Sequence, residues 1–396
     1  MIRLLVLSVA LSACGPARTA PPLERCAPAP ASTHPKAARW RATLDALAVE
    51  TRVSGLSVAV VDGDGLWAGT AGMADPTFDV PFEPCMPSPI FSVTKTVMTA
   101  ATLSLVEAGA LSLDDRVETQ LSAEALRGLA NADRLTVRDL IGQTSGLPDY
   151  VDTTQVLRAF DQPAQRWTNA QALDLVRGRP PLFAPGARFS YSNSNWLVLA
   201  QVLEASTGQG HDVVLRERVL ERLGASRARY RPDDFDHTGI VRGLFDATGT
   251  DRFVDVTETL GRAQVGPDGG LVSDASSLAT LFHGLLVERR LLSAGTHGLM
   301  ETFRPTSEDV ERGGWASLPG RVGYGLGLIE WTTDRFRAVG HSGDGFGYQA
   351  HAYSVPAARA TVVLLANSST PSLVPGNASW RIDRAMERLV AEVANP

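Results

Sequence analysis

The sequence predicts an α/β protein of the α+β type, in which an antiparallel sheet flanked by helices lies beside an all-helical domain. Two observations support this fold class. Short β-type runs separated by turn residues occur near both ends of the chain, whereas the long middle carries apolar residues at helical spacing. The 396 residues, 44% of them hydrophobic, are enough for a large core. A compact fold would therefore pair strands from the two ends in one sheet.

The first predicted elements are a helix and a hairpin. Apolar residues recur at helical spacing in "ARWRATLDALAVE" (38–50). The next segment, "GLSVAVVDGDGLWAGTAG" (55–72), contains two β-rich runs joined by a turn at 62–65. Both strands belong to the predicted sheet.

The middle of the chain, roughly 93–286, reads as helical, and several of its segments have glycine just past the end. The segments with this periodicity are 93–109, 135–142, 193–208, 212–224 and 274–288. We therefore predict a helical domain at 101–264 and a sheet domain formed by 39–100 with 265–396.

The C-terminal part predicts further strands and a closing helix. Four β-type runs occupy 322–331, 336–343, 348–355 and 360–369. An amphipathic pattern then runs through "SWRIDRAMERLVAEVA" (379–394), which predicts a helix that packs on the sheet.

The N-terminus predicts export. Arg3 precedes "LLVLSVAL", an apolar run too short to span a bilayer, so residues 1–13 read as a signal peptide. The residues that end at Cys14 resemble a bacterial lipobox, which predicts a periplasmic or cell-surface lipoprotein anchored through Cys14. An ordinary cleaved signal with an incidental cysteine is the alternative. We expect no other membrane association.

Residues 14–38 are rich in proline and alanine and predict a poorly ordered tether. If Cys14 is acylated, Cys26 and Cys85 remain as a pair in an oxidising compartment. A disulfide between them and two unpaired thiols are both consistent with the sequence.

Charge and composition exclude several classes of function. A formal net charge of −6 without a basic stripe argues against a nucleic-acid partner. The seven histidines show no metal-ligand spacing, and the glycines of "GHSGDGFG" (340–347) do not precede a helix, as a phosphate-binding loop would. We therefore expect no metal and no cofactor.

The first chemical candidate is the pair Ser92 and Lys95 in "SPIFSVTKTVMTAATL". The segment changes from extended to helical at Ser92, and Lys95 lies one turn later on the same face. Lys36 and Lys95 are the only lysines among 37 basic residues. A buried lysine can lose its proton and activate a serine, whereas arginine stays charged. The alternative is a helix-capping serine with an unrelated surface lysine.

Two further motifs could complete a site. Tyr191 and Asn193 precede a predicted helix, where a phenol could relay protons and an amide could hold a carbonyl. A core tyrosine with Asn193 as the helix cap is the alternative. His-x-Gly occurs at His341 and again at His237. We favour His341 because it lies between strand-like runs, whereas His237 lies in a polar stretch without a period.

Taken together and in this order, Ser-x-x-Lys, Tyr-x-Asn and His-x-Gly resemble the three motifs of the serine beta-lactamase and D-alanyl-D-alanine carboxypeptidase superfamily. The branch most similar holds class C beta-lactamases, His-x-Gly DD-peptidases and family VIII esterases. The supporting segments are "QTSGLPDY" (143–150), "FAPGARFSYSNSNWLVLAQVLE" (183–204), "PDGGLVSDASSLATL" (267–281) and "YGLGL" (324–328). The resemblance extends from about residue 40 to the C-terminus and implies a beta-lactamase/transpeptidase-like fold with its site between the two domains.

This resemblance implies a role for each catalytic position. Ser92 would be the nucleophile that forms an acyl-enzyme, Lys95 its activating partner and Tyr191 the proton shuttle to the leaving group. Asn193 would hold the substrate amide.

The third motif, with Gly343 as its last residue, would lie on a strand facing Ser92. There His341 and Ser342 would meet a substrate carboxylate or polar group. The backbone N–H groups of Ser92 and Asp344 would form the oxyanion hole.

One departure from the family pattern affects the expected substrate. Beta-lactamases of this branch usually carry Lys-Thr-Gly at the third motif, but this chain has His341 and Ser342. A histidine partly charged near neutral pH would hold a carboxylate weakly or in a pH-dependent way. The departure favours a D-alanyl-D-alanine carboxypeptidase-like peptidase or an esterase over a class C-type beta-lactamase.

The sequence thus predicts a secreted, monomeric serine hydrolase with a small-molecule or peptide substrate, either a D-amino-acid peptide, an ester or a beta-lactam. A penicillin- or peptidoglycan-binding receptor that is acylated without turnover is the non-enzymatic alternative.

Overall fold

The computed structural model describes residues 23, 25–27, 32–151, 167–230, 239–258, 266–306, 318–370 and 377–395. The predicted signal peptide, Cys14 and His237 lie outside these residues. Within the described ranges, no helix combines the length and the apolar character that crossing a membrane requires.

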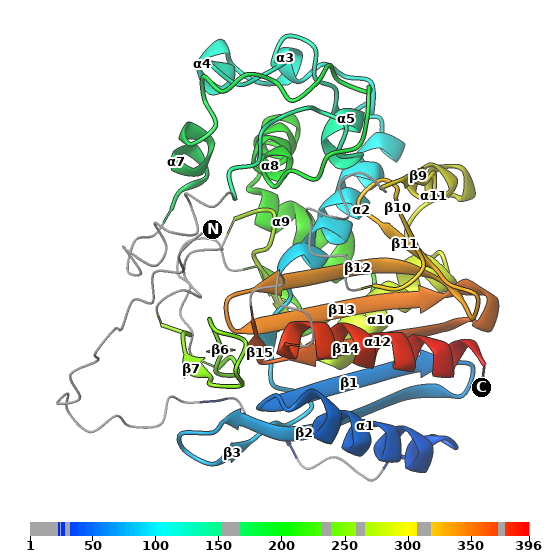
Figure 1. Cartoon of the computed structure of the whole chain (residues 1–396). Coiled ribbons are helices and arrows are strands. Elements are labelled where there is room, and N and C mark those ends of the chain that lie inside the picture. The colour runs from blue at the N-terminus through cyan, green and yellow to red at the C-terminus, as the bar shows by residue number, and fades with distance from the viewer. Residues whose placement is uncertain are drawn as a thin grey trace, which may run out of the picture.

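A nine-stranded sheet forms the centre of the fold (Figure 1). Its order is β3-β2-β1-β14-β13-β12-β11-β10-β9, and every pairing is antiparallel. The strands are β1 (Gly55–Asp62), β2 (Gly65–Asp75), β3 (Val80–Pro81), β9 (Arg304–Pro305), β10 (Arg321–Tyr324), β11 (Ile329–Thr332), β12 (Arg337–Gly345), β13 (Tyr348–Val355) and β14 (Ala360–Ala366). Strand β1 pairs with β14 through Val58 and Leu364, which confirms that strands from the two ends share one sheet.

The two faces of the sheet bury different helices because successive side chains of a strand point to opposite faces. In β14, Val362 and Leu364 pack in one apolar cluster with helices α1 (Ala37–Thr51) and α12 (Ala378–Ala394). Val363 and Leu365 belong to the other cluster, with α2 (Thr94–Glu107) and α10 (Ala275–Phe282). Each such side chain stabilises the fold by about 1.5–3 kcal/mol on burial.

The remaining helices lie mostly between the two groups of strands in the sequence. They are α3 (Val117–Gln120), α4 (Ala123–Leu126), α5 (Val137–Ile141), α7 (Asn169–Asp174), α8 (Ser194–Thr207), α9 (His211–Leu215) and α11 (Ala294–Met300), with π-helical turns at Arg216–Leu220 and His283–Val287 and 3-10 turns at Phe91–Val93 and Pro356–Ala358. Helices α3, α4, α5, α7 and α8 group away from the large sheet (Figure 1). The helices predicted at 93–109, 193–208 and 274–288 are confirmed.

Two small sheets complete the architecture. One has the order β4-β8-β5 and the other β15-β6-β7. Their strands are β4 (Ser88–Pro89), β5 (Arg229–Tyr230), β6 (Leu244–Phe245), β7 (Val254–Asp255), β8 (Leu271–Ser273) and β15 (Ser368–Ser369). Strands of two or three residues have no measurable period, so the sequence did not predict those in the helical middle.

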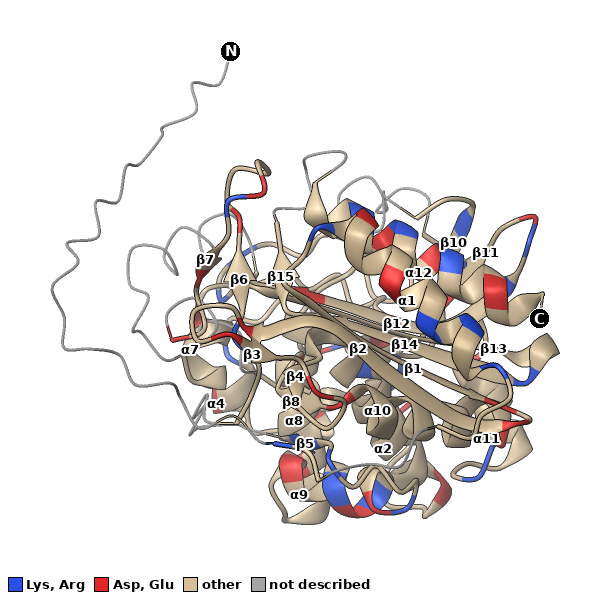
Figure 2. Ribbon diagram, turned by 90° about the horizontal axis from the view of Figure 1, so that it is seen from below, with Lys and Arg blue, Asp and Glu red and all other residues tan. Residues whose placement is uncertain are grey.

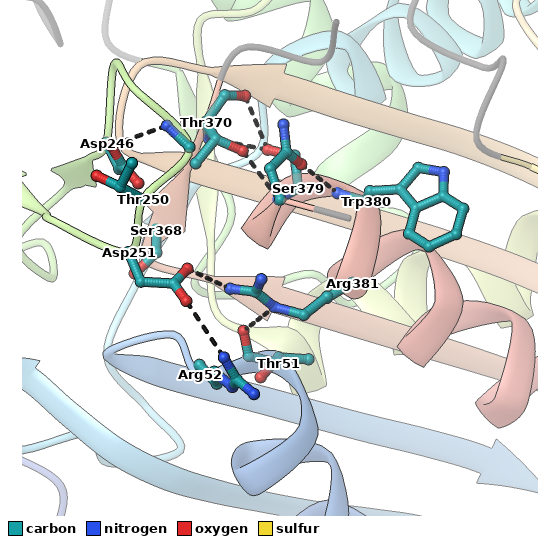
Figure 3. A network of polar contacts seen from close by, with 12 residues as sticks. Thr51, Arg52, Asp246, Thr250, Asp251, Ser368, Thr370, Ser379, Trp380 and Arg381 are labelled. Carbon is teal, nitrogen blue, oxygen red and sulfur yellow. Dashed lines mark hydrogen bonds and ion pairs between the residues drawn. The ribbon is translucent and has the colours of Figure 1, made fainter. Parts of the chain in front are cut away.

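Charged residues line the exposed sides of α1 and α12 (Figure 2). Arg388 of α12 donates to Glu50 of α1 at 2.8 Å. Near the start of α12, Arg381 pairs with Asp251 at 2.5 Å and donates to the carbonyl oxygen of Thr51 at 2.8 Å (Figure 3). These contacts join the N-terminal helix, the 246–251 loop and the C-terminal helix.

The segment that precedes α1 is attached to the fold, so the expectation of a poorly ordered tether is wrong for its described residues. Cys26 and Cys85 form a disulfide, one of the two arrangements that the sequence left open. Further along, His34 Nε2 lies 3.0 Å from Asp62 Oδ1, and Lys36 Nζ lies 2.9 Å from Asp62 Oδ2. Lys36 is thus ion-paired to the β1–β2 turn and belongs to the folded part, as Lys95 does.

Candidate active site

Ser92 lies in the 3-10 turn that leads directly into α2. The preceding strand β4 pairs with β8, and the backbone N–H of Ile90 donates to the carbonyl oxygen of Leu271 at 3.0 Å. Phe91 adopts a φ of 43°, a region that residues other than glycine rarely occupy. This turn presents Ser92, which is partly exposed, at the start of the helix.

Lys95 contacts the Ser92 hydroxyl, as the one-turn spacing predicted. Its Nζ lies 2.8 Å from Ser92 Oγ and 2.7 Å from the carbonyl oxygen of Asp268. The side chain is 0% exposed. Burial lowers the pKa of Lys95 to about 8, against the opposing effect of the Asp268 and Asp149 carboxylates. Lys95 can therefore release its proton near neutral pH and accept that of Ser92.

Tyr191 joins the same pair. Its hydroxyl is hydrogen-bonded to Ser92, and its ring centroid lies 5.2 Å from Lys95 Nζ. Burial raises the pKa of Tyr191 well above the usual value of a phenol. The group is therefore a neutral phenol that can donate a proton to a leaving group.

Asn193 does not use its side chain to cap α8, although it occupies the N-cap position. Its Nδ2 donates to Asp149 Oδ2 at 3.0 Å, and its backbone N–H donates to Asp149 Oδ1 at 2.9 Å. Burial raises the pKa of the Asp149 carboxyl to about 7, with Val151 and Asn193 N–H groups acting in the opposite direction. Asp149 thus orients the Asn193 amide.

The loop that carries Tyr191 is held by Gln143. The side-chain oxygen of Gln143 accepts hydrogen bonds from the Ser192 N–H at 2.9 Å and from Asn195 Nδ2 at 2.6 Å. Its backbone oxygen accepts from the Ser190 N–H at 2.9 Å. Three contacts around Tyr191 therefore fix its position relative to Ser92.

The third motif lies on β12 beside Ser92. Strand β11 pairs with β12 only as far as Gly340, so residues 341–345 have a strand neighbour, β13, on one edge. A Cβ atom at Gly343 would lie 2.2 Å from the carbonyl oxygen of Ile90 and 2.9 Å from the backbone nitrogen of Ser92. Only glycine allows this approach. The close approach at Gly343 places the segment before Asp344 next to the backbone nitrogen of Ser92. The oxyanion hole formed by the backbone N–H groups of Ser92 and Asp344 stays a prediction.

His341 is neutral, which corrects the expected partial charge near neutral pH. The side chain is 0% exposed, and burial, followed by the charge of Lys95, lowers its pKa to about 3. Its Nδ1 lies 2.6 Å from the carbonyl oxygen of Ser342, so Nδ1 carries the proton and donates. Nε2 is then the acceptor for the Tyr324 hydroxyl at 3.3 Å. His341 therefore offers a substrate carboxylate no positive charge.

Sequence reasoning assigned no role to several residues of the site. Gln143, Asp149 and Tyr150 lie in "QTSGLPDY", Asp268 lies in "PDGGL", and Tyr324 opens "YGLGL". These segments carried the resemblance only as supporting matches. An acidic residue in a turn has no periodicity that reveals its partner, so only the fold relates Asp268 to Lys95.

The model of the Beta-lactamase family matches residues 40–385. The chain belongs to this family. It is thus a serine hydrolase of the beta-lactamase-like fold, as the three motifs predicted.

Among curated relatives, penicillin-binding protein 4 of Amycolatopsis lactamdurans is 28% identical over 83% of this chain and 85% of its own length. A D-aminopeptidase of Brucella anthropi is 28% identical over 79% of this chain, and the match spans 56% of that protein. Among solved structures, a D-stereospecific amidohydrolase from Streptomyces sp. superposes with a TM-score of 0.69 at 26% identity, covering 83% of this chain and 94% of that one. This solved structure shares the fold on which the candidate site lies.

Proposed function

We propose that the protein hydrolyses an amide or ester bond of a D-amino-acid derivative through an acyl-enzyme on Ser92. The observation that carries this proposal is the contact between Ser92 Oγ and the buried Lys95 Nζ at 2.8 Å, with Tyr191 on the same hydroxyl. The family, and relatives named D-aminopeptidase and D-stereospecific amidohydrolase, support a D-amino-acid substrate.

Acylation would proceed by transfer of the Ser92 proton to neutral Lys95. The Ser92 oxygen attacks the carbonyl carbon, a C–O bond forms, and the carbonyl oxygen gains a negative charge. Backbone N–H donors of Ser92 and Asp344 would stabilise that charge by about 3–4 kcal/mol each. The C–N or C–O bond to the leaving group then breaks as Tyr191 donates its proton, which Lys95 replaces. Water reverses these steps and releases the acid.

The neutrality of His341 selects among substrates. A peptidase that removes a C-terminal D-alanine binds a free carboxylate, and a beta-lactamase binds the carboxylate of its lactam. Because His341 is uncharged and Asp149 adds a carboxyl to the site, we expect uncharged amides and esters to be better substrates than carboxylate-bearing ones. The D-alanyl-D-alanine carboxypeptidase, beta-lactamase and non-hydrolysing receptor activities remain the other outcomes of the test.

The test combines labelling with turnover. A fluorophosphonate should label wild-type protein and fail to label Ser92→Ala. Ser104→Ala is the matched control, because Ser104 lies on the same helix with its hydroxyl bonded to the Ala101 carbonyl oxygen. Turnover is then compared on a D-amino-acid amide, a p-nitrophenyl ester, a D-Ala-D-Ala peptide and a chromogenic cephalosporin.

Each outcome decides between the candidates. Faster turnover of the amide or ester supports the proposal. Preference for the D-Ala-D-Ala peptide or the cephalosporin would assign a carboxypeptidase or a beta-lactamase instead. Labelling by penicillin without product release would assign the receptor, and unchanged activity of Ser92→Ala would exclude the mechanism.

The proposal includes export and a lipid anchor at Cys14. The disulfide between Cys26 and Cys85 supports export, because disulfides persist in oxidising compartments. Labelled palmitate should enter the wild-type protein in the producing cell and be absent from Cys14→Ser. Incorporation that survives this substitution would refute the anchor. We also expect a monomer, which light scattering would check.

A further inference from the structure

Lys95 is surrounded by groups from several distant segments. Besides Ser92, its Nζ contacts the backbone oxygen of Asp268, 173 positions later in the chain. Asp268 lies in the turn that leads into β8 and also carries a carboxyl group. Its backbone oxygen therefore contacts the amine, and its carboxylate acts on the amine through its charge, which raises the pKa of Lys95.

The Asp268 carboxyl occupies a specifically built position. The residue is 8% exposed, and the hydroxyl oxygen of Tyr150 lies 3.1 Å from both carboxyl oxygens. A Cβ atom at Gly266 would lie 2.6 Å from Asp268 Oδ1, so glycine at 266 leaves the space for this carboxyl. A phenolic donor aimed at both oxygens favours the ionised carboxylate.

Proton transfer from Ser92 creates a charge where water is excluded. Neutral Lys95 becomes an ammonium ion when it takes the serine proton, and a buried ion without a partner costs several kcal/mol. The carboxylates that bear on Lys95 are those of Asp268 and Asp149. The other titratable groups that face it, Tyr191 and His341, are neutral, as is Tyr150 behind Asp268.

We propose that Asp268 is a positioning residue for acylation, whose backbone oxygen aims the Lys95 amine at Ser92 and whose carboxylate, held by Tyr150, stabilises the ammonium ion that proton transfer forms. Asp268 acts through Lys95 and does not touch the reacting carbonyl. This inference rests on the proposed acylation of Ser92. Asp149 supplies the second negative charge, but its hydrogen bonds go to Asn193 and Val151.

The pKa values agree with this arrangement. Burial raises the pKa of Asp268, and Lys95 and Tyr150 act against that rise. Burial lowers the pKa of Lys95, and Asp268 is the first of the groups that oppose the fall. Replacing the carboxylate with a neutral amide should therefore lower the pKa of Lys95 further.

The small number of lysines makes this directly measurable. Protein grown with lysine carrying ¹³C at Cε contains two labelled positions, Lys36 and Lys95. Their NMR signals are followed against pH in wild type and in Asp268→Asn, and Lys36→Arg assigns them. We expect the Lys95 midpoint to fall by about one pH unit or more in Asp268→Asn, since a nearby opposite charge shifts a pKa by about 1–3 units. The Lys36 midpoint should not move.

Labelling kinetics provide the functional readout. The pH at which fluorophosphonate labelling reaches half its maximal rate should fall with the Lys95 midpoint, and the maximal rate should fall about tenfold, because a weaker base accepts the proton less well. A residue with a merely structural role would slow labelling at every pH without moving that midpoint. Asp274→Asn is the matched control, because Asp274 is a buried aspartate that caps α10.

The outcomes separate this inference from the proposed function. Wild-type protein that is not labelled on Ser92 would end the proposed function. Normal labelling with an unmoved Lys95 midpoint in Asp268→Asn would overturn only the role of Asp268. If Asp268→Asn does not fold, Lys36 and Lys95 will both be exposed to water and titrate at the same pH. Asp268→Ser is then measured in its place, with the same expected shift of the Lys95 midpoint.

Discussion

The two lysines of this chain have opposite surroundings. Lys36 precedes α1, and its side chain is 31% exposed and directly bonded to Asp62 and Asp64 at 2.9 and 3.0 Å. Lys95 is fully buried in α2 and bonded to a hydroxyl and a backbone oxygen. The charges of two aspartates favour the ammonium form of each lysine. The pKa of Lys36 is raised, whereas that of Lys95 is nevertheless lowered to about 8.

This difference shows that burial has a larger effect on the pKa of a lysine than the number of carboxylates nearby. At Lys36 the first cause of the shift is a direct hydrogen bond to Asp62, which favours the ammonium ion. At Lys95 the first cause is the loss of water, and the two aspartates only reduce its effect. The same side chain is therefore a structural cation in one place and a base in the other.

The largest effect is expected from removing the base. Lys95→Met should slow fluorophosphonate labelling of Ser92 by about 10²- to 10⁴-fold, the usual contribution of general base catalysis. Lys95→Arg should be as slow, because arginine keeps its proton. Lys36→Met should label at the wild-type rate. Slow labelling of Lys36→Met, or labelling of Lys95→Met at the wild-type rate, would contradict the different roles of the two lysines.

The next largest effect is expected from removing the disulfide that attaches the segment before Lys36 to the fold. Cys85→Ser should lower the free energy of unfolding by about 2–4 kcal/mol, because the disulfide to Cys26 limits the unfolded chain. Urea unfolding measures the change, and Cys26→Ser should give the same value. An unchanged urea midpoint would mean that the ion pairs of Lys36 alone attach this segment.

The pH dependence of labelling follows from the lowered pKa of Lys95. The amine is active when unprotonated, so the rate should rise through about pH 8 and fall about tenfold per unit below it. Below about pH 7 the fall should become shallower, because the Asp149 carboxyl then gains a proton and no longer raises the pKa of Lys95. Asp149→Asn should remove this shallower part. A midpoint near 10.4, the ordinary lysine value, would show that Lys95 is exposed to water.

The smallest effect is expected from Lys36 itself. Lys36→Met should lower the free energy of unfolding by about 1 kcal/mol or less, since the pairs are partly exposed, and high salt should reduce the difference. Because its folded pKa is raised, this stabilisation is complete below the unfolded value near 10.4 and is lost as the pH rises through the folded value. Lys36→Arg should retain it. A loss as large as that of Cys85→Ser would contradict the ranking.

Much of the fold could be predicted because its signals are local. Alternation in 360–369 and helical periodicity in 93–109 each arise within one segment, and both elements are present as β14 and α2. The presence of β1 and β14 in one sheet was predicted from the need to bury strands from both ends together, whereas their direct pairing was not. The two-residue strands β5, β6 and β7 were missed because such short strands leave no pattern.

The candidate site could be predicted where identity and spacing decide contact. The spacing of Ser92 and Lys95 on one helix face implies their hydrogen bond, and the family resemblance pointed to Tyr191 and to the strand with Gly343. The expectation of a loose segment before α1 failed because proline and alanine content says nothing of a distant cysteine or of Asp62. The predicted partial charge of His341 was wrong because the His-x-Gly motif does not show that the fold buries this side chain.

By itself, the sequence determined which chemistry the chain can perform: a serine, a lysine one turn later, a tyrosine and a glycine-ended strand motif. Only the tertiary structure decided the protonation of these groups and the partners that hold them. It buried Lys95 against the carbonyl oxygen of Asp268, bonded the Asp268 carboxyl to Tyr150, made His341 neutral, and joined Cys26 to Cys85. The reason is physical, because the cost of a charge depends on the water removed from it and on groups that the fold brings from far along the chain.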